Sequence, residues 1–588
     1  MSRICAAAAL LFVVVGSARA QAAPAQREDG EWSMPAKDYA ATRFSGLAQI
    51  TPSNAKRLSA AWTFSTGVLG GHEGQPLVVG NTMYVVTPYP NVVYAFDLTK
   101  EGYPLRWRYR PNVSAAAIGM ACCDLINRGA FHADGRIVFN LLDGHTVAVD
   151  ALTGKELWKT KVAELALGET MTMAPLVVKD RVIVGNAGGE YGVRGWVKGL
   201  DLRTGEIVWT GFNTGSDTDV LARPGTFKPF YQSGSELALE SWPQDGWRHG
   251  GAPVWGWLSY DPELDLVYYG TGNPAPYNAE RRPGDNRWAT SVLARNPSDG
   301  FLRWAYQFTP ADNWDYDSTQ EMMLTELSIG GRPRKALVHF DKNGFVYVLD
   351  RATGEVLSAE SYVPVNWAKR VDLKTGRPEV DSTKLTGASR GNVTNICPAL
   401  EGGKNQQPAA YSPATRLFYV PTNNLCMDYQ TSDVSYVAGT PYTGASIPYR
   451  PGEGGHLGAF IAWDATKGRK VWEIREPYPV WSGALATAGG VVFYGTLDGW
   501  FKAVDARKGT VLWKMKIGSG VVGNPISFRG PDGKQYVAVY AGFGGDWGLI
   551  SGDVRSDDPA DVRPPAGFMP DIARHTSQGG IVWLFALK

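Results

Sequence analysis

The sequence predicts an all-β fold, a single eight-bladed β-propeller, from a repeated hairpin motif and from a composition rich in turn residues and tryptophan. The 588 residues include 69 Gly, 37 Pro and 21 Trp. Glycine and proline at this level indicate many tight turns, and so many tryptophans indicate a packing role that recurs along the chain. The length would allow several domains, but all-β folds can run this long as one unit.

The first twenty residues have the pattern of a secretory signal peptide. Arg3 supplies positive charge, residues 6–15 form an apolar run, and residues 17–20 fit an A-x-A cleavage site. The apolar run is too short to span a bilayer, and the polar residues 21–30 do not continue a helix. We therefore expect export to the periplasm, removal of residues 1–20, and one propeller over residues 21–588 with no membrane span.

A hairpin motif recurs along the chain: an apolar strand, usually an aspartate, a turn that ends in glycine, and a strand that ends in tryptophan. The clearest copies are residues 148–158, 199–209, 294–304, 462–472 and 503–513, and looser copies are 95–107 and 348–357. The aspartate can cap backbone N–H groups, and the glycine can take the positive-φ position. The tryptophan can dock between adjacent sheets, so neighbouring repeats must stack to bury their faces.

With the copy that ends at Leu357 counted, a further partial copy at Trp62 brings the repeat to eight turns. Trp107, Trp158 and Trp209 are evenly spaced at an interval that suits a four-stranded blade. The final strand, residues 581–587, is expected to pair with an N-terminal strand and close the ring, which removes exposed sheet edges. A β-solenoid or a set of sandwiches does not explain matching hairpins at both ends of the chain.

Charge and motif content exclude several classes of function. The formal net charge of +1 gives no electrostatic footprint for nucleic acid or for an acidic membrane. The sequence contains no Rossmann fingerprint after a strand, no P-loop and no H-E-x-x-H motif. It also lacks C-x-x-C-H, so no c-type haem is attached to this chain. Cys5 leaves with the signal peptide, and four cysteines in an oxidising compartment favour two disulfides.

Six motifs, in this order along the chain, resemble those of the PQQ-dependent methanol/ethanol dehydrogenase family. They read GGHEGQPLVV, ACCDLINRGAF, APLVVKDRVIVGNAGGEYGVRG, WGWLSYDPELDLVYYGTGNPAPYN, TPADNWDYD and ATAGGVVFYGTLDG. The similarity covers nearly the whole mature chain. It implies an eight-bladed quinoprotein that oxidises an alcohol to an aldehyde or ketone, using pyrroloquinoline quinone (PQQ) and one metal ion.

The resemblance implies that PQQ lies between a vicinal disulfide, Cys122–Cys123, and the ring of Trp255. Arg128 can form bidentate bonds to a cofactor carboxylate, and Lys342 can bond a quinone oxygen. Ala187 stands where many relatives have serine, and GFGGDWG, which contains Trp547, departs by one residue from the family spacing. The implied cofactor contacts are Glu73, Cys122, Cys123, Arg128, Thr172, Ala187, Gly188, Gly189, Trp255, Lys342, Asn405, Trp481 and Trp547.

By the same resemblance, the metal ligands are Glu190, Asn273, Asp315 and Asp317. Their oxygen atoms suit a calcium-like ion rather than zinc. Asp317 stands where the lanthanide-dependent branch of the family has an extra aspartate. Three carboxylates balance a trivalent ion, whereas a divalent ion would leave one carboxylate in repulsion. Lanthanide(III) is therefore favoured over calcium, although an aspartate such as Asp317 can also simply cap a turn.

The implied mechanism makes Asp315 the general base for the alcohol hydroxyl, with hydride transfer to the quinone. Because the chain carries no haem, the electrons would pass to a separate periplasmic cytochrome c. The resemblance also implies a second disulfide, Cys397–Cys426, that staples the long insertion between Leu357 and Trp472. A homodimer is common among relatives, and the sequence shows no interface.

Two other functions stay open at the level of sequence. A calcium-dependent relative that oxidises bulkier secondary alcohols, sugars or aldehydes would share these motifs, because substrate choice depends on loops over the cavity. Those loops are expected at residues 212–250, 365–403 and 546–579. A non-catalytic propeller, such as an outer-membrane assembly scaffold, would share the hairpins but needs neither adjacent cysteines nor a carboxylate cluster.

Overall fold

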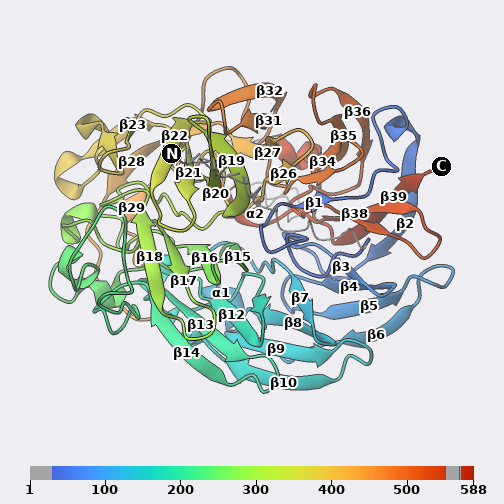
Figure 1. The fold of residues 1–588 in the computed structure, drawn as a ribbon, viewed down its shortest axis with the longest axis horizontal. Helices are drawn as coiled ribbons and strands as arrows, with labels where there is room; N and C mark the ends of the chain where they lie inside the picture. Colours follow the sequence, from blue (N-terminus) through green and yellow to red (C-terminus); the bar gives the residue numbers. More distant parts are fainter. Residues whose placement is uncertain (1–29, 551–568, 570) are drawn as a thin grey trace, which may run out of the picture.

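The computed structural model describes residues 30–550, 569 and 571–588. Its sheets surround a common centre, and the chain visits them in order around the ring (Figure 1). The all-β propeller prediction is therefore confirmed. The predicted signal peptide, residues 1–20, lies outside the described residues, as does most of the predicted mouth loop 546–579.

Most sheets of the ring contain four antiparallel strands that pair in sequence order. The first three sheets are β3 (Leu77–Val79) with β4 (Thr82–Val86), β5 (Val93–Asp97) and β6 (Leu105–Tyr109); β7 (Ala130–Ala133) with β8 (Arg136–Leu141), β9 (His145–Asp150) and β10 (Glu156–Lys161); and β11 (Leu176–Val178) with β12 (Arg181–Gly185), β13 (Trp196–Asp201) and β14 (Ile207–Phe212). The next two are β15 (Leu258–Asp261) with β16 (Leu266–Gly270), β17 (Ser291–Arg295) and β18 (Leu302–Gln307); and β19 (Met323–Ile329) with β20 (Arg332–Phe340), β21 (Phe345–Asp350) and β22 (Val356–Ser361).

Two further sheets bring the ring back towards the N-terminus. They are β26 (Ala410–Ser412) with β27 (Leu417–Asn423), β31 (Gly458–Asp464) and β32 (Arg469–Glu476); and β33 (Leu485–Thr487) with β34 (Val491–Gly495), β35 (Trp500–Asp505) and β36 (Val511–Lys516), to which β1 (Phe44–Ser45) adds in parallel. The first strands of three of these sheets, β11, β26 and β33, are wholly buried, because neighbouring sheets cover both of their faces.

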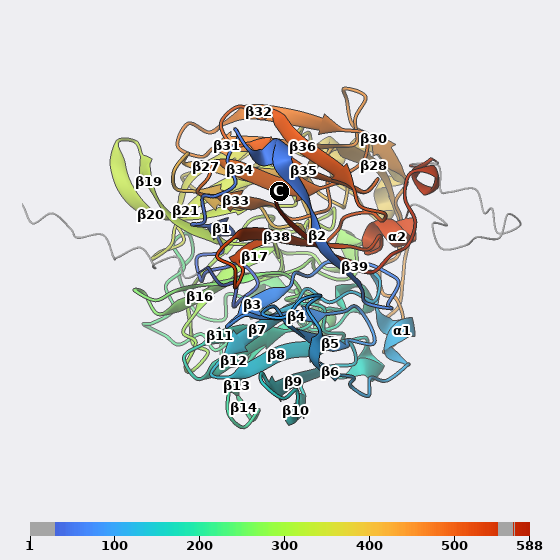
Figure 2. The ribbon, with the colours of Figure 1, turned by 90° about the vertical axis from the view of Figure 1, so that its right-hand side faces the viewer.

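The remaining sheet joins the two ends of the chain. Its strands are β2 (Leu58–Ser65), β39 (Ile581–Leu587), β38 (Gln535–Ala541) and β37 (Ile526–Arg529), in that spatial order. In β2 and β39, which are antiparallel, Leu58 lies opposite Leu587 and Ser65 lies opposite Ile581. Both views show β2 and β39 side by side (Figures 1 and 2). The predicted closure by residues 581–587 is confirmed with the expected boundaries.

The repeat tryptophans make a recurring contact between adjacent sheets. The indole N–H of Trp158, in β10, donates to the carbonyl oxygen of Leu202 in the next sheet (3.0 Å). The Trp158 ring lies so close to Gly205 that a Cβ there would come within 2.6 Å of it. The same type of bond joins Trp62 to Gly102, Trp107 to Ala151, Trp209 to Pro297, Trp304 to Arg351, and Trp472 to Ala506.

The insertion between β22 and β32 carries its own small strands. They are β23 (Ala368–Asp372), β24 (Arg377–Val380), β25 (Asn392–Ile396), β28 (Leu425–Thr431), β29 (Ala445–Ser446) and β30 (Tyr449–Pro451). The disulfide Cys397–Cys426 joins the segment after β25 to β28. The predicted bridge is present and joins two segments of the insertion.

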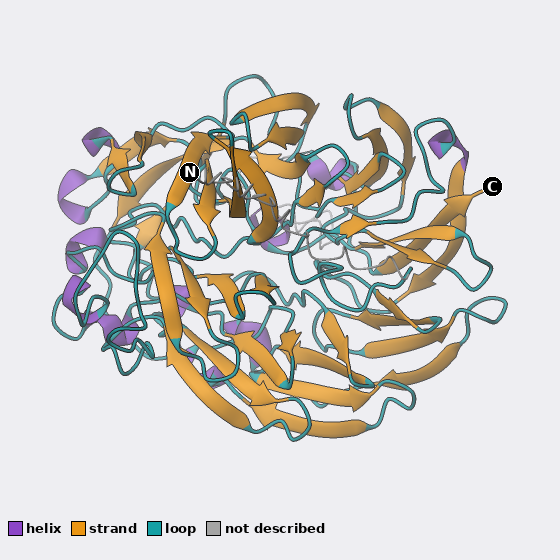
Figure 3. Cartoon of the chain, viewed as in Figure 1, coloured by secondary structure: helices purple, strands orange, loops and turns teal. Residues whose placement is uncertain are grey.

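Helices are short segments within the connecting loops (Figure 3). They comprise α1 (Ala117–Met120), α2 (Asp546–Ile550) and the 3₁₀ turns η1 (Ala55–Arg57), η2 (Leu165–Leu167), η3 (Gly189–Tyr191), η4 (Leu239–Ser241), η5 (Gly246–His249), η6 (Ala279–Arg281), η7 (Ser382–Lys384), η8 (Ala388–Arg390) and η10 (Ile572–Arg574). Within the described ranges, none has the length and apolar character needed to cross a bilayer. In Figure 2, α1 and α2 lie on the same side of the molecule.

Candidate active site

A cavity of about 200 Å³ gathers residues that are far apart in the sequence. Its walls come from segments that precede the first strand of a sheet or follow the second strand. Because these two strands are antiparallel, the start of one and the end of the next meet at the same edge of the sheet. The predicted site residues that line the cavity are Cys122, Cys123, Arg128, Thr172, Ala187, Gly188, Glu190, Trp255, Asp315, Asp317, Lys342 and Asn405.

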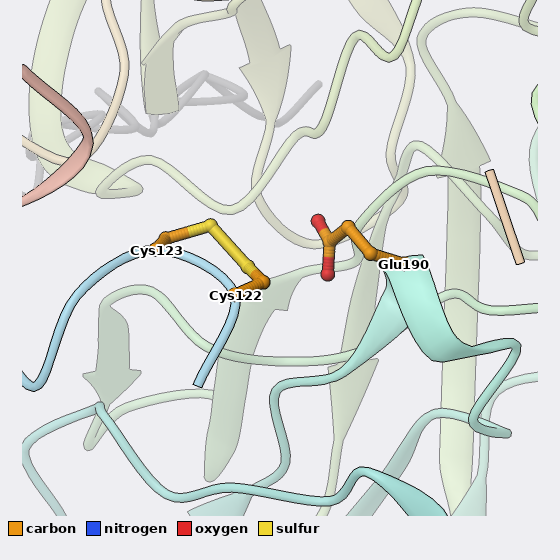
Figure 4. Close-up of side chains that lie close together, drawn as sticks. All are labelled: Cys122, Cys123 and Glu190. Atoms are coloured by element: carbon orange, nitrogen blue, oxygen red, sulfur yellow. A yellow bond between two sulfur atoms is a disulfide. The ribbon is translucent and has the colours of Figure 1, made fainter. Parts of the chain in front are cut away.

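The predicted vicinal disulfide, Cys122–Cys123, is present in the wall of this cavity. The carboxylate of Glu190 turns towards it (Figure 4), and a carboxylate oxygen and the two sulfur atoms lie within 4.8 Å of one another. Disulfide sulfurs are not thiolates and so are not strong metal ligands. The contact therefore shows that the disulfide and the carboxylate group belong to one site, rather than a cysteine metal centre.

Arg128 connects several parts of the wall. Its guanidinium donates to Thr172 Oγ1 (3.0 Å) and to the carbonyl oxygen of Trp255 (3.1 Å), and its Cζ lies 5.0 Å from the centroid of the Trp255 ring. A second arm pairs with the buried carboxylate of Glu73 at 2.9 Å. Burial lowers the pKa of Arg128, and the nearby carboxylate of Glu73 opposes that shift because it stabilises the charged guanidinium.

Glu73, Trp481 and Trp547 lie behind this wall. Trp481 donates its indole N–H to Glu73 Oε1 at 3.2 Å. The Trp547 ring packs edge-on against Trp481, with centroids 5.4 Å apart. In the segment where the family spacing is broken, the residue that lines the cavity is Asp546, the neighbour of Trp547.

Two of the four predicted metal ligands contact Lys342, and a third, Asn273, contacts one of these two. The ammonium of Lys342 contacts Asp315 Oδ2 at 3.1 Å and Asp317 Oδ2 at 2.6 Å. The backbone N–H of Asn273 donates to Asp317 Oδ1 at 2.7 Å. Gly189, the residue before Glu190, lies very close to the side chain of Asn273. A Cβ added to Gly189 would come within 2.8 Å of Asn273 Oδ1. Only a residue without a Cβ allows this close approach.

The donor set fits a hard cation. Asn273 Oδ1 and Asp315 Oδ1 are buried and accept no hydrogen bond from any described residue. A buried oxygen left without a donor is costly, and coordination to a cation would satisfy it. Carboxylate and amide oxygens are the ligands that calcium-like ions take in proteins.

The electrostatics of the cluster favour added positive charge. Burial, reinforced by Asp317, raises the pKa of Glu190 to about 6. Burial also raises the pKa of Asp315 well above its usual value; Lys342 opposes this shift, and the carboxylate of Asp317 adds to it. Burial alone would lower the pKa of Lys342, but Asp315 and Asp317 outweigh it and raise that pKa. One ammonium thus faces more negative charge than it can balance.

Some cavity residues were not anticipated from the sequence: Asp124, Tyr277, Leu400, Glu401 and Asp546. Glu401 accepts hydrogen bonds from Asn405 Nδ2 (2.8 Å) and from the hydroxyl of Tyr449 (3.0 Å). Both Glu401 and Asp546 lie beside paired glycines, in LEGGKN and GFGGDWG. The sequence feature that could have identified these two residues is a carboxylate next to a Gly-Gly pair, close to a predicted cofactor residue.

Comparison with known proteins identifies the family. The model of the PQQ glucose/ethanol/alcohol dehydrogenase β-propeller domain matches residues 32–375 and 470–537. The chain belongs to this family of PQQ-dependent alcohol dehydrogenases. The lanthanide-dependent methanol dehydrogenase of Methylacidiphilum fumariolicum (strain SolV) is 51% identical over 571 residues, covering 96% of this chain and 93% of the relative.

Two further relatives agree with this assignment. Subunit 1 of the methanol dehydrogenase (cytochrome c) of Paracoccus denitrificans is 41% identical over 596 residues, covering 98% of this chain and 93% of the relative. A solved structure of a europium-containing methanol dehydrogenase superposes with a TM-score of 0.92 at 51% identity, covering 95% of this chain and 99% of that one. The predicted family and the prediction of an oxidoreductase are confirmed, and the scaffold alternative is set aside.

Proposed function

We propose that the protein oxidises a small alcohol to an aldehyde or ketone with PQQ and one metal ion, lanthanide(III) in preference to calcium. The observation that carries this proposal is the oxygen cluster around Lys342. Glu190, Asp315 and Asp317 line one cavity that also holds a vicinal disulfide, and Asn273, from a third loop, donates its backbone N–H to Asp317.

The cofactor would be held by residues already in contact with one another. The disulfide Cys122–Cys123 and the ring of Trp255 offer two flat walls, which suits a planar tricyclic molecule. Arg128 offers a charged fork for one of its carboxylates. Lys342 offers a point charge for a quinone oxygen. Thr172, Asn405 and the backbone at Ala187 and Gly188 supply further polar contacts.

The metal preference follows from charge. Glu190, Asp315 and Asp317 bring three carboxylates, and Lys342 is the cation that contacts two of them. A trivalent ion could balance all three once Lys342 turns to the cofactor, whereas a divalent ion would leave one carboxylate in repulsion. The names of two relatives, a lanthanide-dependent and a europium-containing enzyme, support the same choice.

The residues of the chain divide the chemistry between them. When bound, the quinone supplies a hydride acceptor and the metal ion a Lewis acid. Asp315 takes the proton of the alcohol hydroxyl as general base. Lys342 and Arg128 stabilise the negative charge that develops on the cofactor rim. Trp255 and Tyr277 are apolar walls that keep water away from the reacting atoms.

Three further proposals concern the setting of this reaction. The sheets serve as eight blades, supported by the recurring tryptophan bond between neighbouring sheets. A separate cytochrome c accepts the electrons, supported by the absence of C-x-x-C-H from the sequence and by the name of one relative. Export to the periplasm is supported by the pattern of residues 1–20.

Reconstitution tests the proposed function. Purified protein, stripped of metal, is combined with PQQ and either calcium or a light lanthanide, and dye reduction is followed with methanol and with larger primary, secondary and cyclic alcohols. We expect turnover that depends on PQQ and is higher with the lanthanide. Equal turnover with calcium would remove the charge argument for Asp317, and no turnover with either ion would overturn the proposal.

A further inference from the structure

We infer that Arg282 is a positioning residue for the metal site: its guanidinium clamps together the two loops that carry Asn273 and Asp315. This inference rests on the proposed function, because it assigns a task with respect to the metal ion. Arg282 lies outside the cavity wall, is 3% exposed, and belongs to none of the motifs that carry the family resemblance.

Arg282 contacts both loops with separate nitrogen atoms. Its Nε donates to the carbonyl oxygen of Pro276 at 2.7 Å, three residues after Asn273. One terminal nitrogen donates to the carbonyl oxygen of Asp312, three residues before Asp315. The other donates to Asn286 Oδ1 at 2.9 Å, and Asn286 returns a bond to the carbonyl oxygen of Arg282 at 3.0 Å. Each of the three nitrogen atoms of the guanidinium group therefore donates a hydrogen bond, which fixes its orientation.

The Asp315 backbone needs such support. Its φ of +66° lies in the left-handed region, which is costly for a residue with a Cβ and persists only where the surroundings hold it. The buried carboxylate of Asp312 accepts the N–H groups of Trp314 (3.0 Å) and Tyr316 (3.1 Å), the residues on either side of Asp315. Arg282 fixes the backbone at Asp312, so it acts on Asp315 through this turn.

The two loops meet again at the metal site itself. There the N–H of Asn273 donates to Asp317 Oδ1 at 2.7 Å. The loops are thus joined at one end by Arg282 and at the other by the Asn273–Asp317 bond. If the Arg282 end is loosened, the separation of Asn273 Oδ1 and Asp315 Oδ1 is no longer fixed, although neither ligand has been changed.

Arg282→Lys tests the inference because lysine keeps the charge but offers a point donor in place of the fork. The matched control is Arg295→Lys. Arg295 is equally buried, and its guanidinium bonds the hydroxyl of Tyr269 and the carbonyl oxygens of Val220, Gly300 and Phe212. Eu³⁺ affinity of the full chain is measured by competition with a chelator, and the Eu³⁺ luminescence lifetime reports the number of coordinated waters.

We expect Arg282→Lys to weaken Eu³⁺ binding by about 10- to 100-fold, the usual effect of losing a group that orients metal ligands, and to add coordinated water. Arg295→Lys should lower the thermal midpoint but leave the affinity and the water count at wild-type values. An Arg282→Lys protein with wild-type affinity and water count would overturn the inference. Failure of the wild-type protein to bind Eu³⁺ would instead overturn the proposed metal site, and the inference with it.

Discussion

Asp315 and Asp317 share one ammonium partner, Lys342, but occupy different electrostatic positions. Asp317 accepts the N–H of Asn273 on one oxygen and Lys342 on the other. Asp315 contacts Lys342 with Oδ2 only, and its Oδ1 receives no hydrogen bond from the described residues. Asp317 is thus anchored, whereas Asp315 keeps an oxygen for a ligand or a proton. This difference supports separate tasks for the two aspartates.

Asp315→Asn should lower kcat by at least about 100-fold, because general-base catalysis typically contributes a factor of that size or more. The amide keeps the shape of the side chain, so the fold and cofactor binding should persist. Dye-linked turnover and the absorbance of bound PQQ, measured on the same sample, separate the two effects. Turnover near the wild-type level would remove Asp315 from the role of base.

Asp317→Asn and Asp317→Ala should both reduce activation by a lanthanide relative to calcium, because each removes one of three carboxylates. The asparagine variant still offers an oxygen to the N–H of Asn273, whereas the alanine variant does not. The measurement is the ratio of turnover with the two ions in reconstituted protein. If only the alanine variant changes the ratio, the hydrogen bond to Asn273 matters and the charge argument is misplaced.

Much of the candidate site could be predicted from motif positions alone, because the segments that carry these residues precede the first strand of a sheet or follow its second strand and so lie at the same edge. Arg128, Trp255 and Lys342 belong to such segments and line the cavity. Glu401 and Asp546 could not be predicted in the same way. They lie in loops without strand periodicity, and their closeness to Lys342 and Glu73 arises only when distant parts of the ring converge.

At the scale of elements, the tryptophan hairpin connects one sheet to the next. Trp158, in β10, donates its indole N–H to the carbonyl oxygen of Leu202, and its ring covers Gly205. The φ of Gly205 is +76°, in the left-handed region. In the same turn, the carboxylate of Asp201 accepts hydrogen bonds from the backbone N–H groups of Arg203 and Thr204. The motif therefore encodes both a tight turn and the docking site for the preceding sheet.

Trp158→Ala should lower the free energy of unfolding by about 3–5 kcal/mol, the usual range for truncating a buried aromatic ring. Trp158→Phe keeps most of the ring but leaves the carbonyl oxygen of Leu202 without its donor, so a loss of about 1–3 kcal/mol is expected. Urea unfolding followed by tryptophan fluorescence measures both. Equal losses for the two variants would show that the hydrogen bond, rather than packing, dominates the contact.

Elements that carry the repeat were predictable, and several small strands in the insertion were not. The period-two strands and turn chemistry of residues 148–158 locate β9 and β10 directly. The small strands β25 and β29 lie in a polar region without the hairpin motif, whereas β23 and β24 flank residues 371–376, which repeat the aspartate and glycine of that motif. β25 and β29 both pair with β28, to which the disulfide Cys397–Cys426 also connects, and these are tertiary contacts that local sequence does not specify.

At the scale of the whole molecule, the ring holds the site because its ends are joined. β39 lies between β38 and β2 and pairs with both. Its side chains Val582, Leu584 and Phe585 are fully buried in the core. The same sheet lies next to the segment that carries Glu73 and to the one that carries Asp546. An open ring would free these two parts of the cavity wall to separate.

Removal of residues 581–588 should therefore abolish the cooperative fold, because it exposes the edges of β2 and β38 and deletes a strand of the core. Unpaired edges template association with other chains, so we expect aggregation in size-exclusion chromatography and loss of PQQ binding. Removal of Lys588 alone is the control, since this exposed residue follows β39 and its backbone bonds only Arg57 among the described residues. A truncated protein that remains monodisperse and keeps the wild-type thermal midpoint would show that ring closure does not hold the cavity together.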